Sequence, residues 1–397
     1  MSPVQAVATF LARVPLEPLG VERVPVDAAH GRILADAIAA DADYPIAPRS
    51  AMDGFAVRAA DVPGRVRITG EVHMGAAWPH ALRAGEAVRI PTGGVVPEGA
   101  DTVAPVEETK LDGAFVDVAV TLQPGENINA RASDMHAGER VLTPGAAITA
   151  PHAGLLATLG ITHVPVYRKP LVAVLSSGDE LIAPEATPRV GQIRDSNRYA
   201  IAATLRAMGA DVLHVPTVSD EAGELERALR EALARADAVM LTGGSSVGER
   251  DRTPAAIEAL GAAPGVIVHG LRVKPGKPTV FAAAGRKPIV GLPGNPTSAV
   301  VILQAIAAPI VAALTGRSET SSERLEARLA APVSSRPGWT WYVPVSLKQE
   351  AEHWVAHPLP LRSSTVSIIA RAHGYVVVPE NVETYPPGTT VPVTRFI

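Results

Sequence analysis

The sequence contains no cysteine, which excludes disulfide bonds, thiolate metal sites and cysteine nucleophiles. Aromatic residues make up only 4% of the chain, so Ala, Val, Leu and Ile must fill its cores. The formal net charge is −4. Without a basic excess, a nucleic-acid-binding surface is not expected. Any anionic ligand must therefore be held by local groups and not by the field of the whole molecule.

Long uninterrupted hydrophobic runs are also missing. The most apolar stretch, residues 299–315, contains Gln304 and Pro309. It falls short of the roughly 18 apolar residues typical of a membrane span, so we expect a buried helix there. The first residues, MSPVQAVATFLARV, lack the basic start and long apolar centre of a signal peptide, and their spacing favours one face of a helix. We expect a cytoplasmic protein without membrane contact.

The length of 397 residues and changes in pattern along the chain predict several domains. Residues 44–140 alternate β-branched and polar positions between frequent turns, which predicts a β-rich domain. Residues 19–43 and 141–169 flank it with a mixed pattern. Strand-like and helix-like segments alternate over residues 170–318, which predicts a doubly wound parallel sheet. Residues 319–397 return to β patterning and predict a small β domain.

Three predicted strands of the α/β domain end in loops rich in Gly or Ser, namely SSGDEL (176–181), LTGGSSVGERD (241–251) and LPGNPTSA (292–299). Any one of them alone is also typical of an ordinary strand–helix turn. In a parallel sheet, ligands bind beyond the carboxyl ends of the strands, where loop N–H groups can hold phosphate. Three such loops in one sheet predict a phosphate-binding site, with these candidate residues: Gly178, Asp179, Gly243, Gly244, Ser245, Gly294, Asn295 and Ser298.

Charged side chains accompany these loops. In VKPGKP (273–278), prolines and a glycine brace Lys274 and Lys277 as two neighbouring cations, which favours an anion between them over a solvated surface turn. Glu180, Asp220 and Asp251 each follow a predicted strand, so their loops should converge. Carboxylates beside phosphate-binding loops are typical Mg²⁺ ligands. Asp220 and Asp251 also fit helix N-caps, and both interpretations stay open.

Seven strings together resemble the molybdopterin molybdenumtransferase family, which includes the bacterial MoeA proteins and the E domain of gephyrin. They run in family order over residues 50–299: SAMDGFA, IPTGGVVPEGAD, SSGDEL, GQIRDSN, LTGGSSVGERD, KPGKP and LPGNPTSA. The resemblance implies a linking domain (19–43 and 141–169), a β-rich domain (44–140), a molybdopterin-binding α/β domain (1–18 and 170–318) and a C-terminal β-barrel (319–397).

The resemblance also implies an activity. Molybdate would be inserted into adenylylated molybdopterin with Mg²⁺, yielding molybdenum cofactor and AMP. The implied enzyme is an elongated homodimer whose active sites each use both subunits, with a molybdopterin adenylyltransferase as its upstream partner. Asp53, Thr92 and Asp134 would then face the α/β domain of the partner subunit. Glu180, Asp220 and Asp251 match acidic positions of the family's site, and Lys274 and Lys277 lie in the KPGKP string. All five are candidate catalytic residues.

The chain departs from the family pattern at two places. Asn129, Ala132 and Ser133 stand where the family commonly has an Arg and a Gly-Glu pair, and Trp341 and Tyr342 lie where an arginine usually follows Arg-Pro. Other functions considered are a tungstate-inserting paralogue, the molybdopterin adenylyltransferase step and a non-enzymatic scaffold of the gephyrin kind. The long region before residue 170 argues against the second, and the absence of long linkers argues against the third.

Overall fold

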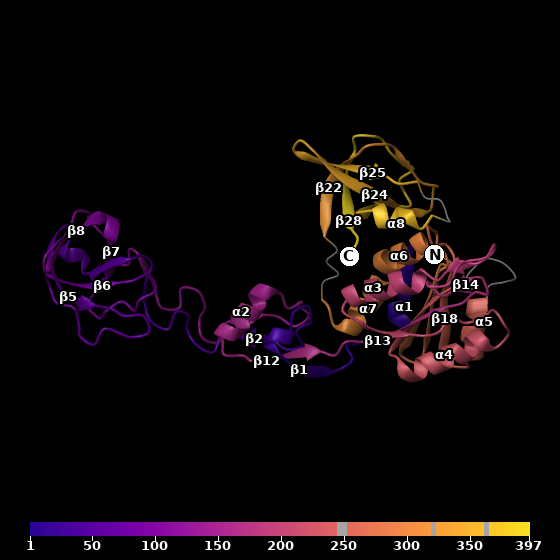
Figure 1. Ribbon diagram of the computed structural model, residues 1–397, viewed down its shortest axis with the longest axis horizontal. Helices are drawn as coiled ribbons and strands as arrows, with labels where there is room; N and C mark the ends of the chain where they lie inside the picture. Colours follow the sequence, from indigo (N-terminus) through magenta and orange to yellow (C-terminus); the bar gives the residue numbers. More distant parts are fainter. Residues whose placement is uncertain (244–251, 319–322, 361–364) are drawn as a thin grey trace. The chain divides into compact units, whose positions relative to one another are not determined.

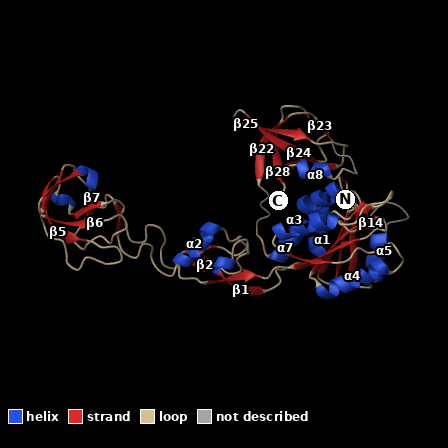
Figure 2. Cartoon of the chain, in the orientation of Figure 1, coloured by secondary structure: helices blue, strands red, loops and turns tan. Residues whose placement is uncertain are grey.

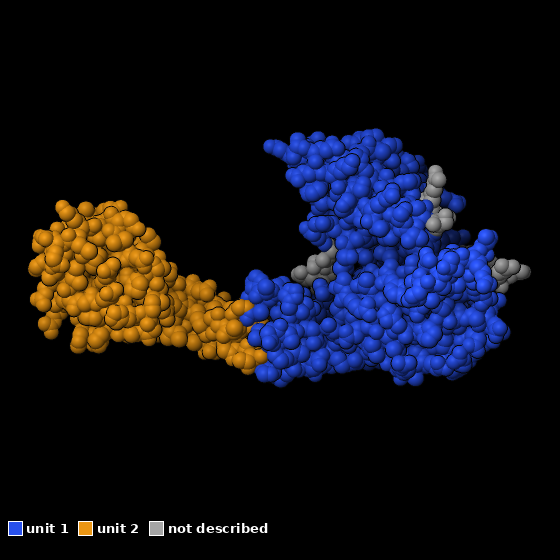
Figure 3. Space-filling view, viewed as in Figure 1, with its two compact units in different colours: residues 1–35, 144–153, 163–397 blue, residues 36–143, 154–162 orange. Residues whose placement is uncertain are grey.

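The computed structural model describes residues 1–243, 252–318, 323–360 and 365–397. The chain forms two compact units, drawn in blue and orange in Figure 3. The larger unit comprises residues 1–35, 144–153 and 163–397, and the smaller one residues 36–143 and 154–162. The finer division into the domains expected from the sequence stays a prediction.

The smaller unit is built around a six-stranded sheet with the order β7-β4-β6-β5-β9-β8. Its side chains Phe55, Val66 and Val116 are almost fully buried, as the alternating sequence pattern requires. The β-rich prediction for this region is confirmed. The sheet strands are β4 (Gly54–Val57), β5 (Gly64–Glu71), β6 (Glu86–Ile90), β7 (Thr102–Pro105), β8 (Thr109–Asp112) and β9 (Phe115–Val118). Short pairs join β3 (Arg49–Ser50) to β10 (Ile128–Asn129) and β2 (Ile38–Ala39) to β11 (Arg140–Leu142).

The larger unit contains the α/β sheet, whose order is β16-β13-β17-β21-β20-β18 (Figures 1 and 2). The predicted parallel strands are confirmed as β13 (Leu171–Ser176), β16 (Asp211–His214), β17 (Ala238–Thr242) and β21 (Lys287–Leu292). The antiparallel strands β20 (Val280–Ala284) and β18 (Pro264–His269), which the parallel prediction did not include, extend the sheet.

Helices cover both faces of this sheet, because its central strands are apolar on both sides. One face packs against α1 (Pro3–Arg13), α3 (Asn197–Ala207), α6 (Pro296–Ile302) and α7 (Ala308–Thr315). The other packs against α4 (Glu224–Arg235) and α5 (Arg252–Ala259). Along β13, Val172 and Val174 belong to the first core, while Ala173 and Leu175 belong to the second. The sheet is therefore doubly wound, as predicted.

The apolar stretch near residue 300 forms one long helix, in which α6 and α7 are joined by the π-helical segment Leu303–Ala307. Residues Pro296–Thr315 are long and apolar enough to cross a membrane by composition, with a mean hydropathy of 2.1. However, 67% of that window is buried inside the protein. This burial is what the core helix of a globular domain shows.

The C-terminal strands form a closed barrel, because the order β24-β25-β22-β28-β26 is completed by pairing of β24 with β26. The predicted small β-barrel is confirmed. Strand β19 (Val273–Lys274), from the α/β domain, adds to the edge of this sheet beside β24. The barrel strands are β22 (Arg324–Leu329), β24 (Thr340–Glu350), β25 (His353–Pro358), β26 (Gly374–Val378) and β28 (Thr390–Arg395).

The remaining elements are short. They are the antiparallel pair β1 (Val21–Pro25) and β12 (His163–Tyr167), the pairs β14 (Leu181–Ile182) with β15 (Ile193–Arg194) and β23 (Val333–Ser334) with β27 (Thr384–Tyr385), the helices α2 (Ala150–Thr158) and α8 (Ser367–Arg371), and the 3-10 turns η1 (Val26–Ala28), η2 (Ala59–Asp61) and η3 (Val106–Glu108).

The N-terminal helix α1 is an integral part of the α/β core. Its start is fixed by a capping box, in which Ser2 and Gln5 each bond the other's backbone N–H. Phe10 is fully buried, and its ring centroid lies 5.8 Å from that of Phe281 on β20. Residues far apart in sequence thus share one core.

We predict that Phe10→Ala lowers the free energy of unfolding by about 3–5 kcal/mol, since it leaves a cavity against Phe281. Urea denaturation of the full chain measures this. Phe115→Ala is the matched control, because Phe115 is 38% exposed on β9 and its truncation leaves no internal cavity. Equal losses in the two variants would contradict the placement of α1 in the core.

Candidate functional site

A hollow lies at the carboxyl ends of the parallel strands, where the strand order reverses direction. In the sheet, β16 lies beside β13 on one side and β17 lies beside β13 on the other. The loops that follow β13 and β17 therefore diverge from each other. Such a switch point is where open α/β sheets bind ligands. The hollow is lined in part by Ser177, Glu180, Asn197, Thr242, Gly243 and Gly294. Of the residues that the sequence predicted for this edge, Glu180, Gly243 and Gly294 line the hollow. Gly178, Asp179 and Asp220 are not among its lining residues.

Position 243 requires a glycine, because the backbone of Ser177 approaches it closely. Its φ is +94°, and a Cβ atom there would fall 2.0 Å from the carbonyl oxygen of Ser177. Gly294 lies next to it, since a Cβ on Gly294 would be 3.8 Å from the Cα of Gly243. The first, second and third loops therefore meet at this point, as the sequence predicted. Gly244, Ser245 and Asp251, also predicted here, lie outside the described residues.

Two buried polar side chains at the hollow were missed by the sequence analysis. Ser177 is 3% exposed and Asn197 is 9% exposed. Ser177 Oγ and Asn197 Oδ1 have no hydrogen-bond partner among the described residues, although Asn197 Nδ2 donates to the carbonyl of Gly294 at 2.8 Å. Both residues lie in strings noted earlier, SSGDEL and GQIRDSN. Buried polar groups are normally paired, so these two have hydrogen-bonding capacity to offer a ligand.

Two of the predicted carboxylates, Glu180 and Asp220, occupy two adjoining loops. A parallel bridge between Ser177 and Val218 brings these loops together, and the backbone N–H of Asp220 donates to Asp179 Oδ1 at 2.9 Å. Asp179 is thus a brace between the loops, and its neighbour Glu180 is exposed. The alternative that Asp220 caps the next helix is wrong, because Gly223 is the N-cap of α4. Within the described residues, no group of three His, Asp or Glu side chains is placed to hold a metal ion.

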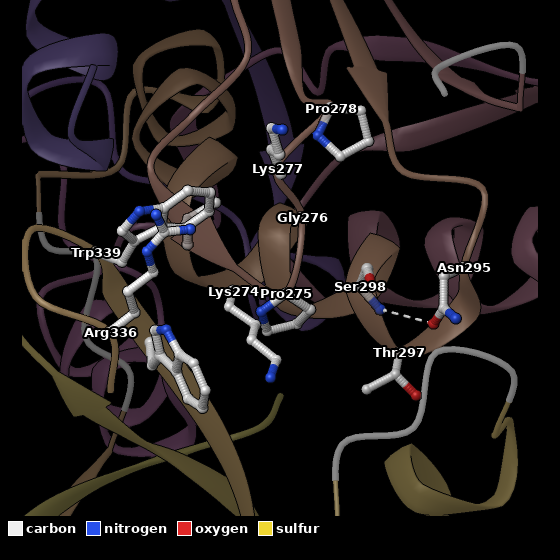
Figure 4. A pocket seen from close by; sticks show the side chains of 12 residues that line it. Lys274, Pro275, Gly276, Lys277, Pro278, Asn295, Thr297, Ser298, Arg336 and Trp339 are labelled. Atoms are coloured by element: carbon white, nitrogen blue, oxygen red, sulfur yellow. Dashed lines mark hydrogen bonds between the residues drawn. The ribbon is translucent and has the colours of Figure 1, made fainter. Parts of the chain in front are cut away.

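A second pocket, of about 530 Å³, lies where the VKPGKP loop meets the start of α6 and the barrel (Figure 4). Lys274, Lys277 and Ser298, all predicted site residues, line it together with Asn295. Asn295 also caps α6, since its Oδ1 accepts from the N–H of Ser298 at 3.4 Å. The Gly294–Ser298 segment borders both hollows, because Gly294 and Pro296 line the first and Asn295, Thr297 and Ser298 the second.

The barrel supplies three residues to this pocket that the sequence analysis did not assign to the site: Arg336, Trp339 and Trp341. Lys274 Nζ lies 3.9 Å from the centroid of the Trp341 ring, and the Arg336 guanidinium lies 5.6 Å from that of Trp339. The described lining residues include three cations and no acidic side chain. Such a pocket favours an oxyanion. The sequence feature that could have pointed to these three residues is the Arg-Pro pair followed by tryptophans.

The smaller unit carries the other predicted residues. Asp53 lies in the turn before β4, and its Oδ1 accepts from Thr92 N at 2.7 Å and from Thr92 Oγ1 at 3.0 Å. These bonds, mainly the one from the backbone N–H, hold the pKa of Asp53 below its usual value, and Arg89 adds to the effect. Asp134 lies at another turn, where its N–H donates to the carbonyl of Tyr44 at 3.0 Å. All three predicted side chains are exposed.

We predict that Thr92→Val raises the pKa of Asp53 part of the way towards its normal value, because the hydroxyl bond is lost while the backbone bond remains. NMR titration of the carboxylate measures this. Since the folded-state pKa is depressed, the stabilising contribution is present above the unfolded-state pKa and is lost as pH falls through the folded-state value. An unchanged pKa in the variant would remove Thr92 Oγ1 as a cause.

Comparison with known proteins covers nearly the whole chain. Residues 1–160 match the family described as MoeA N-terminal region (domain I and II). Residues 173–313 match the probable molybdopterin binding domain, and residues 326–396 match the MoeA C-terminal region (domain IV). The three matches follow one another in the same order as the β-rich, α/β and barrel parts of the structure.

Two similar proteins and one solved structure point to the same family as these matches. The molybdopterin molybdenumtransferase of Bacillus subtilis is 34% identical over 374 residues, covering 91% of this chain and 86% of its own. That of Haemophilus influenzae is 35% identical over 318 residues, covering 79% and 78%. The molybdopterin biosynthesis MoeA protein from Pyrococcus horikoshii has a TM-score of 0.81 at 31% identity, covering 100% of this chain and 99% of its own. By sequence and by fold, the chain belongs to the MoeA family.

Proposed function

We propose that this chain is a molybdopterin molybdenumtransferase, which inserts molybdate into adenylylated molybdopterin and releases AMP. The names of its relatives support the reaction class. The observation that carries the proposal is the cation-lined pocket around Lys274, Lys277 and Arg336, next to the hollow at the strand ends. One substrate is an oxyanion and the other bears phosphates, so two adjoining anion-binding hollows suit the pair.

In this proposal the second pocket holds molybdate. Lys274 and Lys277 supply positive charge, and the hydroxyl of Ser298 supplies a hydrogen bond; Ser298 is 8% exposed at the start of α6. Because no acidic side chain is found among the described lining residues, the cations are not neutralised from within the pocket. Cations without a carboxylate beside them in the pocket favour the binding of an anion.

The strand-end hollow would hold the phosphate-bearing part of molybdopterin. The groups available there are backbone groups near Gly243 and two atoms without a partner among the described residues, Ser177 Oγ and Asn197 Oδ1. Cleavage of the phosphoanhydride transfers the adenylyl group to water and leaves AMP and the molybdopterin phosphate. Such a reaction depends on positioning and charge neutralisation more than on a covalent nucleophile, which suits a site of this composition.

We further propose Mg²⁺ as a cofactor held by Glu180 and Asp220, with Asp251 as a third candidate from outside the described residues. Mg²⁺ commonly takes one or two carboxylates together with substrate phosphates and water, so two carboxylates on adjoining loops fit it. When bound, the ion would neutralise charge on the phosphates. Unchanged AMP release after removal of Mg²⁺ with EDTA would contradict this assignment.

The exposed pair of Asp53 and Thr92, with Asp134, is proposed to complete the site of a partner subunit in a homodimer. An aspartate is an anion at neutral pH, and the hydrogen bonds from Thr92, mainly the one from its backbone N–H, lower the pKa of Asp53 further. A permanent carboxylate suits orienting a ligand or a metal-bound water better than transferring protons. We propose that the dimer works in the cytoplasm and receives its substrate from a molybdopterin adenylyltransferase.

We predict that Lys277→Ala lowers the rate of AMP release from adenylylated molybdopterin about 100-fold, as loss of one positioned charge does in other sites. Lys348→Ala, on β24 and exposed, is the matched control. Molybdate and tungstate assayed in parallel test the oxyanion, and molybdate should be the better substrate. An unchanged rate in Lys277→Ala would remove that lysine from the site, and a preference for tungstate would favour a tungstate-inserting paralogue.

A composite site has a distinctive consequence for mixed dimers. Asp53→Ala and Lys277→Ala should each be nearly inactive alone, but a heterodimer of the two contains one site with both residues intact. Random mixing of the two variants should therefore restore about a quarter of wild-type AMP release. Size-exclusion chromatography checks that dimers form. If active mixtures never appear although heterodimers form, each site belongs to a single subunit.

A further inference from the structure

Lys274 and Trp341 are held side by side by the backbone. Strand β19 pairs in parallel with β24, in a register that sets Lys274 opposite Trp341. The N–H of Thr340 also donates to the carbonyl of Arg272 at 3.0 Å, which fixes the two strands just before this pair. Paired residues on neighbouring strands project to the same side of a sheet. The position of Lys274 beside the indole is therefore set by the sheet.

The indole ring is the neighbour that holds the ammonium group. Lys274 Nζ lies 3.9 Å from the ring centroid, a distance at which the negative face of the ring attracts a cation. No carboxylate forms an ion pair with Lys274 in the described ranges of the chain. A carboxylate would neutralise the lysine, whereas a neutral ring orients it and leaves its charge for a ligand.

Trp341 also carries an unused donor. Its Nε1 atom is buried and has no hydrogen-bond partner among the described residues, although the residue lines the pocket. A buried N–H without an acceptor is costly, so an oxygen-rich ligand or a water is expected to satisfy it. Two properties of one side chain thus bear on the pocket: its ring face and its N–H group.

We propose that Trp341 is a positioning residue for oxyanion binding, which acts by holding the Lys274 ammonium group through its ring face. This inference rests on the proposed function, in which the pocket binds molybdate. The ring adds no charge of its own, and it orients a cation that the pocket already has.

The test compares three substitutions in the full-length protein. Trp341→Leu removes the ring, and should raise the KM for molybdate in AMP release about tenfold while kcat changes less than about twofold. Trp341→Phe keeps a ring face without the N–H, and should stay within about threefold of the wild type. Trp354→Leu is the matched control, since Trp354 lies on β25 of the same barrel and is 40% exposed. It should behave as the wild type.

A double-mutant cycle shows whether Trp341 acts through Lys274. If it does, Trp341→Leu combined with Lys274→Met should bind molybdate no more weakly than Lys274→Met alone. Calorimetry with molybdate alone measures these affinities without any turnover. Thermal melting confirms that each variant is folded, and Trp341→Met, which also lacks a ring, replaces Trp341→Leu if the latter does not fold.

The outcomes separate the two proposals. A wild-type protein that binds molybdate but releases no AMP contradicts the transferase reaction, while the binding series still decides the role of Trp341. Equal losses in Trp341→Leu and Trp341→Phe would assign the effect to the N–H group and overturn positioning by the ring. Additive losses in the cycle, or wild-type affinity in Trp341→Leu, would overturn it as well.

Discussion

The meeting of three strand-end loops at Gly243 is the constraint on which the rest of the site depends. Parallel pairing of β13, β17 and β21 ends these strands at one edge of the sheet, and the absence of a side chain at Gly243 lets the Ser177 carbonyl approach. This contact sets Gly294 beside the first two loops. Because the same segment continues into Ser298, it also fixes the border of the cationic pocket. The two hollows therefore share one wall.

The barrel does more than cover this site, because it also helps to hold the lysine loop in place. Strand β19 leaves the α/β domain and pairs with β24, so that the loop with Lys274 and Lys277 is hydrogen-bonded to the barrel at one end. Between the two lysines, Gly276 packs closely on α6, since a Cβ there would lie 2.3 Å from Ile302. The loop that carries the lysines is thus attached to two structural elements. Pairing of this kind keeps charged side chains in place before a ligand arrives.

Much of this arrangement could be predicted from the sequence, and the reasons for the rest are physical. Alternation of apolar strands with amphipathic helices predicted the parallel sheet, and glycine at the ends of strands predicted which loops meet. The antiparallel strands β18 and β20 were missed, because a buried apolar strand carries no sign of its direction. Ser177, Asn197 and Arg336 were missed because only tertiary packing reveals that a polar atom is buried without a partner, or that a barrel loop reaches the pocket. Family strings, not physical chemistry, pointed to Asp53, Thr92 and Asp134.

The central claim is that an oxyanion binds where the VKPGKP loop, the start of α6 and the barrel meet. Anomalous diffraction at the molybdenum edge, from crystals soaked in molybdate, tests it most directly. The account predicts an anomalous peak in this pocket, with the molybdate oxygens within hydrogen-bonding distance of Lys274, Lys277 and Ser298. Strong molybdenum density elsewhere on the chain, with this pocket occupied only by water, would contradict it.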